Sequence, residues 1–366
     1  MNRISRFFRA HLGIHITLLV SLTVILLYFL LRPLKPLMNF LICRVTTPYK
    51  RLMSSILSFL PFSFAEFLWA AAIVFLLCFL IQTILRLFRP GKQRRAVLLY
   101  RRGVGLLSAG LAVYAGFCLL WGVNYYGDSF TEKSGIHAEP VSAAQLEETA
   151  RKFAILANEA SAYVPRDSAN RFAMSRSEIL SQCGSLYETV EKEFPFLAGN
   201  LPAPKPVFFS KIMSLIHFTG FFFPFTGEAN LNIDSPACML PSTIAHEMAH
   251  QKNIAPEQEA NFTAVLVCLK SNHPAYRYSG ALMGYIYLGN ALFEADREAW
   301  REVSSLLNDA VRADLEYNNA YWAEFETPVN EAAQTVYNSF LQSYGQELGV
   351  KSYGACVDLL VARYGN

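Results

Sequence analysis

The stretch Thr243-Ile244-Ala245-His246-Glu247-Met248-Ala249-His250 decides how the second half of this chain is organised. Side chains four positions apart stack on one face of a helix, so His246 and His250 can direct both imidazoles at one point. Imidazoles at this spacing suit Zn²⁺, and Glu247 then lies close enough to take a proton from metal-bound water. The competing interpretations are a structural, non-catalytic metal and a helix that carries two histidines by chance. Chance is a weak explanation, because the pattern uses two of only 7 histidines in the chain.

The residues around this motif predict two helices joined by a short link. Pro241 suits the first position of the motif helix, and an apolar pattern runs through it: Ile244, Ala245, Met248 and Ala249. Asn253 tolerates the left-handed conformation that ends a helix, and Pro256 can begin the next helix. So short a link allows the start of the second helix to fold back toward the histidines.

A catalytic zinc ion usually takes three protein ligands and leaves its fourth position to water. We expect Glu259, in the first turn or so of the second helix, to be the third ligand, with Glu257 and Glu228 as the competitors. Acidic residues are also favoured at a helix N-terminus by the helix dipole. The residues alone therefore leave open whether Glu257 and Glu259 only decorate the start of that helix.

The first third of the chain has the composition of a membrane protein. Of 366 residues, 53% are hydrophobic and 14% aromatic, which is too apolar for an ordinary soluble enzyme. Three apolar segments approach or exceed the roughly 20 residues that span a bilayer as a helix. We predict transmembrane helices at about residues 13–31, 64–86 and 104–124, in a membrane domain over residues 1–126 that precedes an outer domain over residues 127–366. We expect the first segment to be an anchor rather than a cleaved signal peptide, because Leu31-Arg32-Pro33-Leu34 offers no small-x-small cleavage site.

Basic residues near the membrane predict the orientation of the chain. The loop after the second predicted helix is dense in them: Arg86, Arg89, Lys92, Arg94, Arg95, Arg101 and Arg102. The N-terminus adds Arg3, Arg6 and Arg9. Residues 1–124 hold 15 of the 32 Lys and Arg residues but only one of the 29 acids, Glu66. We predict a multi-pass protein of the cytoplasmic membrane, with its N-terminus inside and an acidic, extracytoplasmic outer domain that does not bind nucleic acid.

The outer domain reads as mainly α with a small β element. Ser142 and Gln145 form a capping box that begins a helix to about Tyr163. Alternating polar and apolar residues over Glu228–Asp234 predict a half-buried strand beside the motif helix, whose edge can hold an extended peptide. Further helices are expected near residues 175–194, 256–269, 275–294, 296–317, 329–343 and 352–364. The sequence contains no C-x-x-C pair, so a cysteine zinc site is not expected, and disulfide pairing stays open.

Several stretches together resemble the DUF3810 family of bacterial membrane proteins. The main ones are Gly220–Asn230, Thr243–Gln251 and Glu257–Phe262, supported by Trp121–Tyr126, Tyr276–Gly280 and Gly349–Gly354. The resemblance implies a fold similar to the zincin metallopeptidases. The Glu259-Ala260-Asn261-Phe262 segment also resembles one in the ImmA/IrrE-type metallopeptidases, which implies Glu259 as the third zinc ligand. Asn253 departs from the family pattern, in which glycine is commoner at this position.

These observations predict a membrane-anchored zinc metallopeptidase with Glu247 as its general base. His246, His250 and Glu259 hold the zinc ion, and the oxyanion needs a further donor, for which Arg277 or Tyr278 is preferred over Tyr276 and His217. The expected partners are the lipid bilayer and a peptide or protein substrate. The alternatives are a non-proteolytic zinc-binding scaffold or sensor and a zinc amidase that acts on cell-wall links.

Overall fold

The computed structural model describes residues 9, 11–88, 95–346 and 353–365. Several residues used above lie outside this range: Arg3, Arg6, Arg89, Lys92, Arg94 and the segment 349–352. The chain divides into two compact units. The apolar unit comprises Met1–Lys50 and Phe64–Gly127, and the globular unit comprises Arg51–Ser63 and Asp128–Asn366. Each unit is described by itself.

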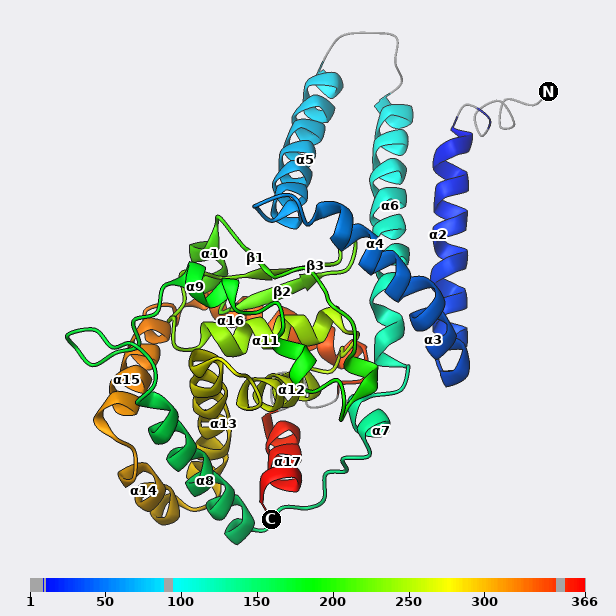
Figure 1. Cartoon of the computed structure of the whole chain (residues 1–366). Helices are drawn as coiled ribbons and strands as arrows, with labels where there is room; N and C mark the ends of the chain where they lie inside the picture. Colours follow the sequence, from blue (N-terminus) through cyan, green and yellow to red (C-terminus); the bar gives the residue numbers. More distant parts are fainter. Residues whose placement is uncertain (1–8, 10, 89–94, 347–352, 366) are drawn as a thin grey trace. The chain divides into compact units, whose positions relative to one another are not determined.

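The apolar unit contains the three predicted apolar helices (Figure 1). They are α2 (Leu12–Leu31), α5 (Phe64–Phe88) and α6 (Arg95–Leu120), and all three are long and apolar enough to cross a membrane. The third begins earlier than predicted and ends at Leu120, because η2 (Gly122–Tyr125) is a separate 3₁₀ turn. Between α2 and α5 lie α3 (Lys35–Leu41), the π-helical turn η1 (Ile42–Thr46) and α4 (Thr47–Leu57).

Helices α2 and α6 pack along each other. His15 and Tyr100 approach to 2.6 Å between Nε2 and the hydroxyl oxygen. The Ser108 hydroxyl donates mainly to Val104 O in its own helix and also lies 3.3 Å from Ile14 O of α2. Because buried polar groups need partners in an apolar environment, these contacts fix how the two helices face each other.

The globular unit is mainly helical, with a three-stranded sheet on one side of α11 and the helices α12 and α13 packed against its other sides (Figure 1). Its helices are α7 (Phe130–Ser134), α8 (Ala143–Ser161), α9 (Arg176–Ser181), α10 (Ser210–Leu215), α11 (Leu240–Gln251), α12 (Glu257–Leu269), α13 (Pro274–Ala295), α14 (Arg297–Ser305), α15 (Asp309–Ala323), α16 (Pro328–Ser343) and α17 (Tyr353–Tyr364), with 3₁₀ turns η3 (Leu186–Thr189) and η4 (Pro195–Leu197). The core lies where α8, α11, α12 and α13 meet.

Local capping signals explain where the prediction succeeded and where it failed. The Ser142–Gln145 capping box begins α8 as predicted. The helix expected near residues 175–194 is wrong beyond Ser181, where turns and η3 replace it. The helix expected near 296–317 is two helices, because the Asn308 side chain accepts from Val311 N and begins α15.

The sheet has the order β1-β3-β2, from β1 (Lys205–Pro206), β2 (Gly220–Phe223) and β3 (Glu228–Leu231). Strand β3 runs parallel to β1 and antiparallel to β2. The prediction of a half-buried edge strand over Glu228–Asp234 is therefore wrong, since β3 is central and all four of its residues are buried. Its polar side chains have partners: Glu228 pairs with Lys205 at 2.7 Å, and Asn230 Oδ1 accepts from Ser63 Oγ at 2.6 Å.

The seven cysteines are all free, and the four in the globular unit are buried. Disulfides therefore do not contribute to the fold. Burial raises the pKa of the Cys183 thiol to about 11, which keeps that thiol protonated and unreactive at neutral pH.

Candidate metal centre

Helix α11 carries the H-E-x-x-H motif through the interior of the globular unit. Pro241 lies in its first turn, and all of its residues except His246 are buried. The helix ends at Gln251, with Lys252 as its C-cap, and Asn253 follows with φ 70°, so the predicted left-handed residue is confirmed. The turn then reverses the chain into α12, whose N-terminus faces α11.

The two histidines of the motif present their ring nitrogens to the same point. Their ring centroids are 4.6 Å apart. The His250 Nδ1 atom lies 2.7 Å from the Ile254 carbonyl oxygen and donates to it, so the lone pair of the neutral imidazole, the form that binds a metal, lies on Nε2. A backbone carbonyl behind one ring nitrogen is the usual way in which a metal-binding imidazole is oriented.

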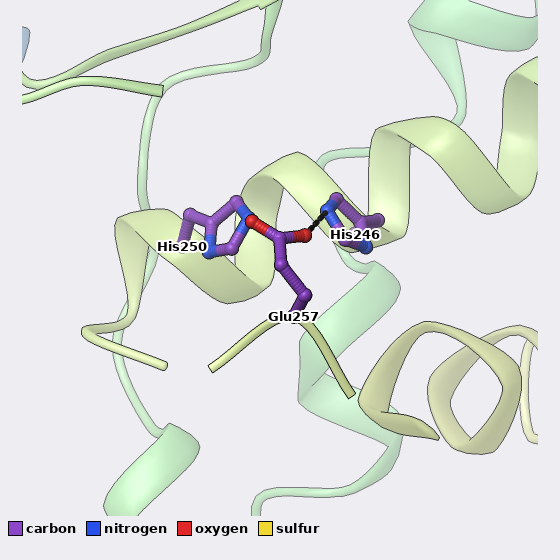
Figure 2. A group of neighbouring side chains, drawn as sticks. All are labelled: His246, His250 and Glu257. Atoms are coloured by element: carbon purple, nitrogen blue, oxygen red, sulfur yellow. Dashed lines mark ion pairs between the residues drawn. The ribbon is translucent and has the colours of Figure 1, made fainter. Parts of the chain in front are cut away.

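Glu257, the first residue of α12, supplies a carboxylate to both rings (Figure 2). Its Oε2 lies 3.3 Å from His246 Nε2, and its Oε1 lies 3.6 Å from His250 Nε2. The three donor atoms all lie within 4.8 Å of one another. Ligand atoms bound tetrahedrally to zinc at about 2.1 Å are separated by about 3.3–3.5 Å. The two distances from Glu257 to the histidines are close to that separation, and this donor set leaves a fourth position open. We refer to His246, His250 and Glu257 as the metal group.

Glu259, the predicted third ligand, lies elsewhere. Its carboxylate accepts from the backbone of α7, with Oε2 2.7 Å from Phe130 N and Oε1 3.3 Å from Thr131 N. Burial raises the pKa of Glu259, and these backbone donors partly offset that rise. Residues two apart on a helix point about 200° apart, so Glu257 and Glu259 face opposite sides of α12. Glu257, the alternative third ligand in the sequence analysis, is the carboxylate that lies beside the two histidines.

The charges of the metal group hold it together. Burial alone would raise the pKa of Glu257, but the two histidines outweigh burial and keep that pKa well below its usual range. Burial likewise disfavours the imidazolium of His250, yet the Glu257 carboxylate outweighs it and raises the pKa of His250 to about 9. A hydrogen bond from the Tyr337 hydroxyl to Glu257 Oε1, 2.7 Å long, adds a fourth side chain from α16. Tyr337 lies 80 residues from Glu257, and no local pattern in the sequence pointed to it.

Glu247 is buried beside the metal group and faces the sheet. Its Oε2 has no hydrogen-bond partner among the described residues. A Cβ atom on Gly220 of β2 would lie 2.5 Å from Glu247 Oε1, so the absence of a side chain at Gly220 makes room for this carboxylate. Burial raises the pKa of Glu247 to about 7, while the two histidines act in the opposite direction.

The residues predicted to stabilise an oxyanion do not take part in the contacts of the metal group. Arg277 Nη1 donates to Ser271 O at 2.9 Å. The Tyr278 hydroxyl donates to Asp314, and the Tyr276 hydroxyl donates to Ile179 O at 3.0 Å. His217 packs its ring against Trp322. Tyr276 and Tyr278 are completely buried, whereas the Tyr337 hydroxyl contacts the metal group through Glu257.

Comparison with known proteins identifies the family and nothing further. The family model described as "Protein of unknown function (DUF3810)" matches residues 44–361, and the chain therefore belongs to this family. No curated protein and no solved structure matches the chain.

Proposed function

We propose that this member of the DUF3810 family is a membrane-anchored zinc hydrolase that cleaves peptide bonds. The observation that carries the proposal is the position of Glu257. It brings a carboxylate to 3.3 and 3.6 Å from the two histidine Nε2 atoms of an H-E-x-x-H helix. Two imidazoles and one carboxylate are the donors of a catalytic rather than a structural zinc site, because they leave one position open.

Each side chain has a distinct role in this proposal. His246 and His250 bind the ion through Nε2, Glu257 binds it through its carboxylate, and Tyr337 holds that carboxylate by its hydrogen bond. A bound zinc ion would polarise the substrate carbonyl and lower the pKa of a water molecule. Glu247 takes a proton on its unpartnered Oε2 from the attacking water and returns it to the leaving nitrogen.

An extended peptide is the substrate that the sheet favours. Among the described residues β2 pairs only with β3, so its other side is an open edge. The Thr219 carbonyl oxygen accepts from Asn232 N, and Phe221 lies opposite Asn230 in the register of β2 and β3. Because backbone groups alternate in direction along a strand, those of Gly220 and Phe222 point toward the other edge of β2. A peptide added there as a strand would lie beside Glu247, because Gly220 packs directly against this carboxylate.

The positive-inside pattern supports a location of the site on the extracytoplasmic side of the cytoplasmic membrane. Three crossings would leave the segment 32–63 and everything after Leu120 on the same side. The grouping of Arg51–Ser63 with the residues after Gly127 in one unit agrees with three crossings.

The test is the zinc content of the full-length protein in detergent. The full chain is needed because Arg51–Ser63 is part of the globular unit and would be lost from a fragment that begins after Gly127. We expect about one zinc ion per chain in the native protein, and loss of the ion in the His250→Ala and Glu257→Gln variants. Glu259→Gln is the matched control, since it changes a carboxylate two residues away and should keep the ion.

Hydrolysis is then measured on a peptide mixture by mass spectrometry. Glu247→Gln should keep the zinc ion and lose about 10²–10⁴-fold of the rate. Loss of zinc in Glu259→Gln but not in Glu257→Gln would restore Glu259 as the third ligand. An absence of zinc from the native protein would refute the proposal. Bound zinc with no Glu247-dependent hydrolysis would favour the scaffold or sensor.

A further inference from the structure

Helix α10 of the globular unit turns apolar side chains outward. The exposed fractions are 85% for Phe208, 50% for Phe209, 57% for Ile212 and 41% for Leu215. The last two are three positions apart on the helix and share one face, and the two phenylalanines lie directly before it. Four large apolar side chains gathered on one short element form a patch that water-exposed surfaces rarely carry.

The opposite face of α10 is buried and carries Ser210, Met213 and Ser214, and the contacts of the two serines fix the orientation of the helix. Ser210 Oγ donates to Val207 O at 2.6 Å and accepts from Ile233 N at 3.0 Å. Ser214 Oγ accepts from Asn232 Nδ2 at 2.9 Å. A helix on a water-exposed surface has the reverse arrangement, with its apolar side inward. The hydroxyl groups anchor α10 in the domain and leave the apolar side chains on its outer face.

The segment Arg51–Ser63 of the same unit repeats this arrangement. Its exposed fractions are 60% for Leu52, 50% for Ile56, 76% for Phe59 and 49% for Phe62. Ser54, Leu57 and Ser63 are buried instead. Lys205 of β1 donates to Leu57 O at 2.7 Å, and Phe208 follows β1 by two residues. The two exposed apolar surfaces are thus carried by elements that contact each other within one unit.

The chain itself indicates what covers these surfaces. Ser63, which donates to Asn230 of β3, is followed immediately by Phe64, the first residue of the apolar helix α5. The point at which a membrane-crossing helix begins is by necessity at the bilayer surface. Through Ser63, the sheet that bears β1 and α10 is tied to that surface by one peptide bond.

We propose that the eight exposed side chains form a docking surface that inserts into the bilayer interface. This membrane-docking surface consists of Leu52, Ile56, Phe59, Phe62, Phe208, Phe209, Ile212 and Leu215. Phenylalanine and leucine are typical of the apolar face of an element that lies in the bilayer interface, and the exposed Arg51 and Lys211 on the same elements suit anionic headgroups. The occupant is the lipid surface that the chain already crosses.

If the protein is the proposed hydrolase, the docking surface also determines where its substrate is bound. Asn230, which accepts from Ser63, registers with Phe221 of β2. Paired strands lie about 4.8 Å apart, so β2 lies about one strand spacing from Asn230, the residue that Ser63 contacts. The site would therefore receive peptide segments close to the membrane surface.

The test uses nitroxide labels on the full-length protein in lipid nanodiscs that contain anionic lipid. Cys43 and Cys78 are the two exposed cysteines and are replaced by alanine. A label is then placed through Phe208→Cys or Ile212→Cys, and its collisions with oxygen, which concentrates in lipid, are compared with those with a nickel chelate, which stays in water. Tyr163→Cys is the control, because Tyr163 is 71% exposed on the same unit and outside the docking surface.

We expect the labels at 208 and 212 to show a several-fold higher ratio of oxygen to nickel collisions than the label at 163. A ratio equal to that at 163 would overturn the proposal, since the surface would then face water. Protection from both reagents, with spin–spin broadening between labels, would also overturn it and assign the surface to a second copy of the chain. Neither outcome depends on zinc or hydrolysis, so failure here is distinguishable from failure of the proposed function.

Discussion

The globular unit contains two groups of ionisable side chains in its interior, and they differ in how their carboxylate oxygens and the neighbouring polar atoms are arranged. We call Arg166, Tyr278 and Asp314 the Asp314 cluster. Asp314 Oδ2 accepts from Arg166 at 2.5 Å and from the Tyr278 hydroxyl, while Oδ1 accepts from Phe172 N at 2.7 Å. Both oxygens of the Asp314 carboxylate are therefore satisfied, although Arg166 Nε is buried without a hydrogen-bond partner among the described residues.

The metal group is different because metal-binding atoms of three side chains lie close to one another. Two imidazole nitrogens share one carboxylate at 3.3 and 3.6 Å, and the first distance is already long for a hydrogen bond. His246 Nδ1 and Glu247 Oε2 are buried and have no hydrogen-bond partner among the described residues. Buried donors and acceptors are normally satisfied, so a group that leaves them over while pointing three donor atoms at one place is suited to a ligand. The convergence of metal-binding atoms from α11 and α12 therefore distinguishes this group from the Asp314 cluster.

Removal of Asp314 should have the largest effect on stability. Asp314→Asn leaves the side chain the same size but removes the charge that faces Arg166, whose side chain is only 15% exposed. A broken buried ion pair typically costs about 3–5 kcal/mol, because the remaining charge is uncompensated. Urea unfolding of the full-length protein, followed by tryptophan fluorescence, measures this loss. The zinc content should stay at the native value, and a variant with unchanged stability would show that the cluster is not a structural one.

Tyr337→Phe tests whether the hydrogen bond to Glu257 supports metal binding by the metal group. The substitution removes only the hydroxyl that donates to Glu257 Oε1. Loss of a partner that orients a metal ligand typically costs about 10–100-fold in metal affinity. We expect that loss in a competition titration with a zinc chelator, together with an unfolding free energy close to native in the metal-free protein. Equal affinity in native protein and variant would mean that Glu257 is held without Tyr337.

Tyr278→Phe is the matched removal of a hydroxyl from the Asp314 cluster. Asp314 keeps Arg166 and Phe172 N as donors, so only one bond to a charged acceptor is lost. That loss should cost about 1.5 kcal/mol of unfolding free energy and leave zinc affinity unchanged. The sequence made Tyr278 a candidate for oxyanion stabilisation. If Tyr278→Phe lowered the hydrolysis rate without lowering stability, that earlier role would be restored.

The sequence predicted those features that depend on neighbouring residues. The three apolar helices, the capping box at Ser142 and the left-handed Asn253 each follow from side chains within a few positions, and the structure contains them all. The choice between Glu257 and Glu259 was harder, because it depends on which face of α12 turns toward α11. That face is decided by α7, whose backbone binds Glu259 from 129 residues away in the sequence.

Features that depend on distant contacts could not be predicted in this way. Tyr337 reaches Glu257 only because α16 folds back over the site, and β3 is central only because β1 adds to it from the other side. The alternation over Glu228–Asp234 suggested one polar, exposed face. Glu228 and Asn230 are buried nevertheless, since Lys205 and Ser63 provide their partners. A polar residue in a strand pattern indicates exposure only when no distant partner exists.

A third ionic group, on the surface, provides the smallest expected effect. Glu193 pairs with Lys270 at the end of α12 and with Arg363 of α17, at 2.6 Å in the second case, and its side chain is 35% exposed. The hydrogen bond from Lys270, with the two positive charges, holds the pKa of Glu193 below its usual value. The group therefore stabilises the fold above the pKa of the unfolded chain and loses that contribution as pH falls through the folded value.

Glu193→Gln should cost at most about 1 kcal/mol at neutral pH, since solvent screens a partly exposed pair. The difference in unfolding free energy between native protein and variant should shrink as the pH is lowered below about 4.3, the ordinary pKa of a glutamate. High salt at neutral pH should shrink it as well, which the buried Asp314 cluster should resist. A difference that persisted at low pH would mean that Gln at this position disturbs packing, and that Glu193 belongs with the structural clusters rather than with solvent-screened pairs.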